Sequence, residues 1–112
     1  MKQILFLILD HGDLVDSIFK ELSKNGFNGT VLQARSIKHL LEDEDSSEDI
    51  SFFNISHLEN RLSFPASTFC YFIVEQDKIE ALKACIRETT GSFKKIKGAF
   101  FSYPIDDFEG SF

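Results

Sequence analysis

Residues 4–9 read Ile-Leu-Phe-Leu-Ile-Leu, and residues 69–74 read Phe-Cys-Tyr-Phe-Ile-Val. Both runs have the length of a β-strand and are apolar at every position rather than at every second one. Because successive side chains of a strand point to opposite faces, each run must bury both of its faces. In a chain of 112 residues, helices can cover only one face of a sheet, so the other face needs a different cover.

The composition is that of a globular protein, with 43% hydrophobic residues, 27% charged residues and 13 Phe. This length predicts a single domain over residues 1–112 with one core. No stretch has the roughly 20 consecutive apolar residues of a membrane span. The apolar run at residues 4–9 also lacks the basic start and the small-residue cleavage site of a signal peptide. We therefore expect a cytoplasmic protein with no membrane span.

The acidic charge of the chain is concentrated in one segment. The net charge is −6, and residues 42–49 (EDEDSSED) contain six acidic side chains. Without that segment, 12 acidic residues balance 12 basic ones. The sequence therefore predicts a neutral body carrying an acidic segment, and it argues against a nucleic-acid partner.

The residue types that carry catalysis or bind metals do not form a recognisable group. Cys70 and Cys85 lie in apolar patterns and are predicted to be buried free thiols. A pair formed by His11 and Asp13 would suit acid–base chemistry, but helix capping explains both residues more simply. We predict no catalytic residues, no cofactor and no enzymatic activity. The three histidines, His11, His39 and His57, are too far apart in the sequence to match a metal-binding motif.

A helix and a second strand are predicted after the first apolar run. Apolar residues at helical spacing begin at Leu14, with Asp13 as the expected N-cap residue and Gly26 as the expected left-handed C-cap. Residues 30–34 (TVLQA) are less apolar than the first run and read as a strand nearer the sheet edge. The apolar stripe of the helix consists of Leu14, Val15, Ile18, Phe19 and Leu22.

The same pattern then repeats in the second half of the chain. A strand over residues 68–74 is followed by a helix, with Asp77 and Glu80 spaced as a capping box and Thr90-Gly91 closing it. Residues 99–103 form the last predicted strand, and Pro104 is expected to end it. The apolar stripe of this helix consists of Ile79, Leu82, Cys85 and Ile86.

This order predicts an α+β, ferredoxin-like βαββαβ fold with an antiparallel sheet in the strand order 4-1-3-2. The two most apolar strands are then central, and both helices cover one face. The other face would be an exposed apolar patch on a single copy, so we expect several copies to pack through it. A long segment over residues 35–67 separates the second and third strands. Residues 36–41 are predicted to form a short helical turn, and residues 42–49 to be solvated.

In element order the chain resembles the PII-like signalling superfamily, whose small ferredoxin-like subunits form trimers. The 35–67 segment stands at the position of that family's T-loop, and the connection after Thr90-Gly91 stands at the position of its B-loop. Residues 98–107 (GAFFSYPIDD) resemble the closing strand of the family: a glycine, an aromatic and apolar run, a proline and an acidic pair. Thr90-Gly91 resembles the Thr-Gly pair that opens the B-loop.

The resemblance implies a trimeric small-molecule sensor that acts in signal transduction. In such proteins a ligand, commonly an adenine nucleotide or a cyclic dinucleotide, lies in clefts between subunits, and the T-loop controls a partner protein. For this chain, the resemblance therefore implies a homotrimer, a nucleotide-type ligand and a regulated partner protein of unknown identity. The implied ligand-binding residues are Arg35, Ser36, Thr90, Gly91, Lys95, Lys97 and Gly98.

Two other classes of protein share the predicted shape. A trimer resembling the CutA proteins would handle metals or carry out catalysis, but the chain lacks Cys/His clusters. A module resembling the ACT domains would bind amino acids, but such modules have a short connection where this chain has the 35–67 segment. We therefore prefer the PII-like interpretation and keep the other two as alternatives.

Overall fold

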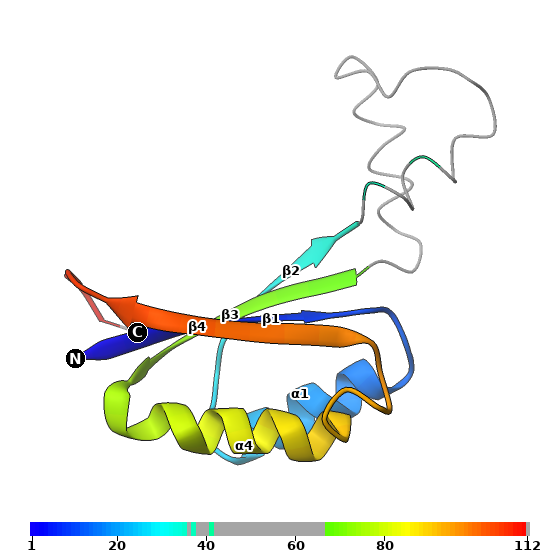
Figure 1. The fold of residues 1–112 in the computed structure, drawn as a ribbon, viewed down its shortest axis with the longest axis horizontal. Helices are drawn as coiled ribbons and strands as arrows, with labels where there is room; N and C mark the ends of the chain where they lie inside the picture. The colour runs from blue at the N-terminus through cyan, green and yellow to red at the C-terminus, as the bar shows by residue number, and fades with distance from the viewer. Residues whose placement is uncertain (36, 38–40, 42–66, 112) are drawn as a thin grey trace.

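The computed structural model describes residues 1–35, 37, 41 and 67–111. It contains one four-stranded sheet with two α-helices on one face (Figure 1). The elements are, in chain order, β1 (Lys2–Leu9), α1 (Leu14–Lys24), β2 (Thr30–Ala34), β3 (Ser67–Glu75), the 3₁₀ helix η2 (Gln76–Lys78), α4 (Ile79–Thr90) and β4 (Gly98–Ile105).

The sheet has the strand order β2-β3-β1-β4, and every neighbouring pair is antiparallel. Strand β1 pairs with β3 from Lys2 opposite Glu75 to Leu9 opposite Thr68. Strand β4 pairs along the other side of β1 over the same length, whereas β2 covers only the first part of β3. The predicted ferredoxin-like topology, with the two most apolar strands in the centre, is confirmed.

The face of the sheet that meets the helices forms the core. Leu5, Leu7 and Leu9 of β1 alternate with residues of the opposite face and are 0% exposed, as the two-residue period of a strand requires. Cys70 and Phe72 of β3 lie on the same face and are also buried. The helices close this core with Ile18, Leu22, Ile79, Leu82 and Ile86.

The opposite face, which we call the open face, is covered by no described helix or strand (Figure 1). Phe6 lies at its centre, with ring centroids 5.2 Å from Phe101 and 5.5 Å from Phe69. Tyr71 and Tyr103 complete a cluster of five rings, with Phe6 in the middle and four rings around it. Phe101 is 49% exposed and Tyr103 is 51% exposed. Three side chains of the runs predicted to need a second cover, Phe6, Phe69 and Tyr71, therefore lie in this cluster beside the exposed rings of β4.

The predicted ends of the helices are partly confirmed. Gly26 and Gly91 have φ angles of +88° and +62°, the left-handed conformation expected after a helix. Asp13 stands at the N-cap of α1, as predicted, but it has helical dihedral angles and makes no side-chain capping hydrogen bond, because a capping side chain needs an extended backbone to reach the free amides. The predicted capping box of the second helix is wrong. Asp77 lies inside η2, which places Lys78 at the N-cap of α4.

The prediction that Pro104 ends the last strand is also wrong. Strand β4 continues to Ile105, and Pro104 lies opposite Gln3 of β1. A proline cannot donate a hydrogen bond to a neighbouring strand, but an edge strand needs donors on one side only. Because β4 is the last strand of the sheet, it accommodates the proline.

Between β2 and β3 the structure describes only Arg35, Ile37 and Leu41. Ile37 and Leu41 have helical backbone and are exposed, in keeping with the predicted turn. The rest of that turn, the acidic run at 42–49 and the other predictions for the 35–67 segment lie outside the described residues. Within the described part of the chain, no helix is long and apolar enough to cross a membrane.

Because leucines at buried and exposed positions differ in their contacts, replacing them by alanine should lower the free energy of unfolding by different amounts. Replacing Leu7, which is fully buried, by alanine should lower the free energy of unfolding by about 2–5 kcal/mol. The matched control is Leu14→Ala, since Leu14 is 36% exposed and should lose about 1 kcal/mol or less. Urea denaturation followed by circular dichroism measures both values, and equal losses would contradict the assigned core.

Candidate functional site

The residues predicted to bind a ligand gather at one end of the sheet. Leu9 at the end of β1 pairs with Gly98 at the start of β4, and Ala34 at the end of β2 pairs with Ser67 at the start of β3. Arg35 follows β2 directly, and the connection from α4 to β4 reaches the same end (Figure 1). Ser36 lies outside the described residues.

Within one chain, these residues stand at opposite edges of the sheet. Arg35 follows the edge strand β2, whereas Gly98 opens the edge strand β4, and β3 and β1 lie between them. Three strand spacings separate the two edges by about 14 Å. A single copy therefore does not bring Arg35 together with the residues around Gly98.

The connection between α4 and β4, which we call the 91–97 loop, begins with an unusual backbone. Gly91, Ser92 and Phe93 have φ angles of +62°, +53° and +64°, so three successive residues are left-handed. For Ser92 and Phe93 this conformation is strained, because their Cβ atoms crowd the backbone. The ring of Phe93 anchors the turn by packing against Phe100, with the ring centroids 6.0 Å apart.

Thr90 holds this turn from inside the core. It is 0% exposed, and its hydroxyl donates to the carbonyl oxygen of Ile86 at 2.7 Å. The same hydroxyl oxygen accepts a hydrogen bond from the backbone N–H of Phe93 at 3.2 Å. The contacts of Thr90 in the structure are therefore those of a residue that orders the loop.

Four backbone amides at the start of the loop already have acceptors within the chain. Ser92 N–H donates to Arg87 O at 2.8 Å and Lys94 N–H to Gly91 O at 3.1 Å, while Lys95 N–H donates to Thr90 O at 3.1 Å. The fourth amide is that of Phe93, which bonds to Thr90. These four amides are therefore not free to bind a phosphate. The cationic groups that the loop offers a ligand are its lysine ammonium groups.

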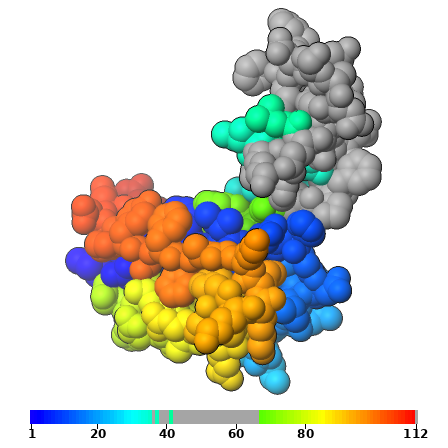
Figure 2. All heavy atoms as spheres, turned by 45° about the vertical axis from the view of Figure 1, so that its right-hand side comes forward, coloured from blue at the N-terminus to red at the C-terminus, as the bar shows by residue number. Residues whose placement is uncertain are grey.

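Lys95 and Lys97 are exposed and lie beside the segment that follows β1. Together with residues 10–14 they line a hollow of about 300 Å³. Figure 2 shows the loop, in amber, against the blue start of the chain on the surface. Asp10 N–H donates to Lys97 O at 2.8 Å, and Asp10 Oδ1 lies 3.2 Å from Nδ1 of His11. The hollow therefore combines positive and negative side chains.

The two glycines of the predicted site have different roles. The aliphatic chain of Lys95 lies across Gly91, where an added Cβ would come 3.0–3.3 Å from three of its carbon atoms. At Gly98 an added Cβ would collide with the carbonyl oxygen of Ile8. Gly91 thus gives Lys95 its position, whereas Gly98 allows β4 to approach β1 closely.

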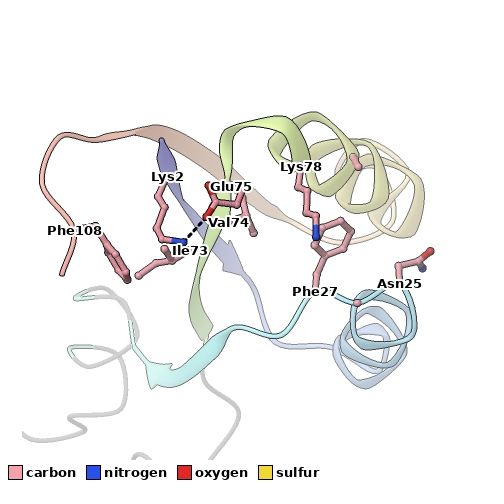
Figure 3. A pocket seen from close by; sticks show the side chains of 10 residues that line it. Lys2, Asn25, Phe27, Ile73, Val74, Glu75, Lys78 and Phe108 are labelled. Carbon is pink, nitrogen blue, oxygen red and sulfur yellow. Dashed lines mark hydrogen bonds and ion pairs between the residues drawn. The ribbon is translucent and has the colours of Figure 1, made fainter. Parts of the chain in front are cut away.

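A larger pocket lies at the other end of the sheet, and no pattern in the sequence indicates it. We call it the β3-edge pocket. It has a volume of about 570 Å³ and lies beside the last residues of β3 (Figure 3). Lys2 bonds to Glu75 at 2.6 Å and lies 5.0 Å from the ring centroid of Phe108. The pocket is lined by Lys2, Asn25, Gly26, Phe27, Ile73, Val74, Glu75, Lys78, Ala81 and Phe108.

Both cysteines are free, as predicted. Burial raises the pKa of Cys70 to about 12, and its thiol donates a weak hydrogen bond to Leu7 O at 3.5 Å. Cys85 is half-buried, and burial followed by the charges of Glu21 and Glu88 raises its pKa. Neither thiol has the low pKa of a reactive cysteine. Among the described residues, no three His, Cys, Asp or Glu side chains are grouped to hold a metal ion.

Comparison with known proteins gives matches at the level of structure. No protein-family model and no curated protein sequence matches the chain. The structure of Arabidopsis thaliana PII bound to citrate aligns over 93% of this chain and 77% of that one, with a TM-score of 0.57 and 16% identity. The chain has a PII-like fold. A functionally unknown protein from Pediococcus pentosaceus aligns over 98% of this chain and 97% of that one, with a TM-score of 0.60 and 10% identity.

The position of Lys95 is expected to depend on Gly91. Gly91→Ala and Gly26→Ala both place a side chain at a positive φ angle, so each should cost about 1 kcal/mol of stability. A Cβ at position 26 meets no atom within 4 Å, which makes that variant the matched control. Only Gly91→Ala should move the NMR signals of Lys95. Equal shifts of Lys95 in the two variants would refute its contact with Gly91.

The contact between Lys2 and Glu75 leads to a prediction about the pKa of Glu75. Its pKa is lowered by the hydrogen bond from Lys2 and then by the charge of Lys2. A lowered folded-state pKa means that the contribution of Glu75 to stability is present above its unfolded pKa and is lost as the pH falls through the folded one. Lys2→Met should therefore raise the pKa of Glu75, as measured by ¹³C NMR of its carboxyl carbon. Lys83, which lies 3.7 Å from Glu80, supplies the control Lys83→Met, which should leave the pKa of Glu75 unchanged.

Proposed function

We propose that the protein is a PII-like regulator in signal transduction that senses a small molecule and has no enzymatic activity. It assembles as a homotrimer through the open face and binds a nucleotide-type ligand in the clefts between copies. It acts in the cytoplasm and controls a partner protein through the 35–67 segment. The observation that carries this proposal is an aromatic, solvent-accessible sheet face on a PII-like fold.

The chemistry of the open face supports assembly. Phe6 at the centre of the sheet and the four rings around it form one aromatic cluster. Leu32, at one edge of the same face, is 53% exposed. Contiguous apolar patches of this kind mark interaction sites in soluble proteins, since each Å² of apolar area removed from water gives about 25 cal/mol. A second copy offers the same aromatic surface and can cover the rings with its own.

The distribution of the predicted ligand-binding residues supports a shared site. Arg35 stands at one edge of the sheet, while Lys95 and Lys97 stand near the other edge at the same end. When sheets associate through their open faces around an axis, the β2 edge of one copy approaches the β4 edge of the next. Arg35 of one copy then faces the lysines of its neighbour across a cleft suited to a phosphate-bearing ligand.

Assembly through the open face predicts that a charge placed on it dissociates the protein. Phe101→Asp should convert the trimer to a monomer that keeps its circular dichroism spectrum, because position 101 is 49% exposed in the single chain. Val31→Asp is the matched control: Val31 is also a strand residue and is 48% exposed, but it lies on the helix side. Light scattering with size exclusion measures the mass, and a monomeric parent protein at micromolar concentration would refute the trimer.

Ligand binding is tested by thermal denaturation against ATP, ADP, AMP and cyclic di-AMP. Citrate is included because the similar PII protein was solved with it. A ligand at a hundred times its dissociation constant should add about 2.7 kcal/mol to the stability. Replacing Lys95 and Lys97 by alanine should abolish the nucleotide effect, whereas Lys20→Ala on α1 should leave it intact. If no nucleotide at millimolar concentration raises the transition temperature, the nucleotide proposal fails.

A further inference from the structure

The β3-edge pocket lies at the opposite end of the sheet from the predicted ligand-binding residues. Its volume of about 570 Å³ falls in the range of small-molecule sites. In Figure 3 the side chain of Phe27 bounds one side and that of Phe108 the other, with the end of β3 between them. The walls are thus partly aromatic, and the pocket is open to solvent between them.

The floor of the pocket is a stretch of strand that β2 does not cover. The pairing of β2 with β3 stops where Thr30 lies opposite Tyr71, four residues before β3 ends. The carbonyl of Tyr71 points toward β2, since a Cβ on Gly29 would lie 2.5 Å from that oxygen. Alternate residues of a strand point their N–H and C=O groups the same way, so Ile73 and Glu75 direct theirs to this uncovered edge.

The charged side chains around the pocket leave one ammonium group without an ion-pair partner. Three charged residues line it: Lys2, Glu75 and Lys78. Glu75 pairs with Lys2 at 2.6 Å and with the N-terminal ammonium group of Met1 at 3.9 Å. Lys78 has no ion pair among the described residues, and its charge contributes only weakly to the lowered pKa of Glu75. The unbalanced charge of the pocket is therefore positive and is carried by Lys78.

The start of helix α4 strengthens this positive potential. Lys78 is the N-cap residue of α4 and makes no side-chain capping hydrogen bond, and Ala81 in the first turn lines the pocket. The first amides of a helix carry partial positive charge and favour an anion nearby. The helix start, the Lys78 ammonium group and the amides of Ile73 and Glu75 are independent donors around one cavity.

We propose that the β3-edge pocket binds a small organic carboxylate with an apolar or aromatic body. The carboxylate accepts hydrogen bonds from Lys78 and from the amides at the β3 edge, while the apolar body lies against Phe27 and Val74, which both line the pocket on the helix side of the sheet. Free phosphate fits this arrangement less well, because it would leave the aromatic side chains without a partner. The pocket is thereby a second ligand site, separate from the cleft between copies.

The test uses the full chain and two probes of the same shape. 3-Phenylpropionate carries the carboxylate, and 3-phenylpropionamide is its neutral analogue. In ¹H–¹⁵N NMR titrations, the acid should shift the amides of residues 73–78 in a saturable way. The amide should bind about tenfold more weakly, since a hydrogen bond to a charged group exceeds a neutral one by about 1.4 kcal/mol. Inorganic phosphate should leave these signals unchanged.

Matched lysine variants assign the effect to the pocket. Lys78→Gln should weaken binding of the acid by about tenfold while the chain keeps its fold, since Lys78 makes no ion pair that it would lose. Lys83→Gln, on the same helix but outside the pocket, should bind as the parent chain does. The proposal is overturned if acid and amide bind equally, if Lys78→Gln binds unchanged, or if no saturable shift occurs at millimolar concentration. A response centred on Lys95 and Lys97 would also overturn it and would support only the proposed inter-copy site.

Discussion

The structure depends on the antiparallel pairing of β1 with β3, two strands that are apolar on both faces. Eight residue pairs join them, from Lys2 with Glu75 to Leu9 with Thr68. The pairing places the leucines of β1 on one face and Phe6 on the other. The helices α1 and α4 cover the leucine face and complete the core. The aromatic face has no such cover within the described chain, and this asymmetry is the physical basis of the proposed assembly.

The core also controls the shape of the 91–97 loop. A turn of three left-handed residues would be unstable in isolation. Here the buried Thr90 hydroxyl and the packing of Phe93 against Phe100 hold it in place. The loop thereby presents Lys95 from a defined position over Gly91. Because the amides of residues 92–95 are already bonded within the chain, this part of the loop offers a ligand its lysine side chains instead.

Local patterns in the sequence indicate the end of the sheet where the residues implied by the PII-like resemblance lie, but they do not indicate the β3-edge pocket. A helix-ending Gly91 and the strand that follows it are visible from neighbouring residues, so the end of the sheet to which they belong could be predicted. The β3-edge pocket depends on the register in which the short strand β2 pairs with the longer β3, and no local pattern encodes that register. Phe27 and Lys78 are distant in the sequence, yet they line one cavity because the α1–β2 connection passes beside the start of α4. Asp13 and Asp77 show the same limit, since a capping pattern does not reveal the backbone conformation that capping requires.

The sequence by itself determined the elements, their order and the central place of the two apolar strands. These follow from hydrophobic periodicity and from the length of each run, which are local properties. The tertiary structure alone decided which side chains of each run face the helices. That choice places Leu7 in the core and Phe6 among exposed rings, because neighbouring strand residues point to opposite faces and only packing selects the covered one. It also decided that one end of β3 stays uncovered, which created the pocket beside it.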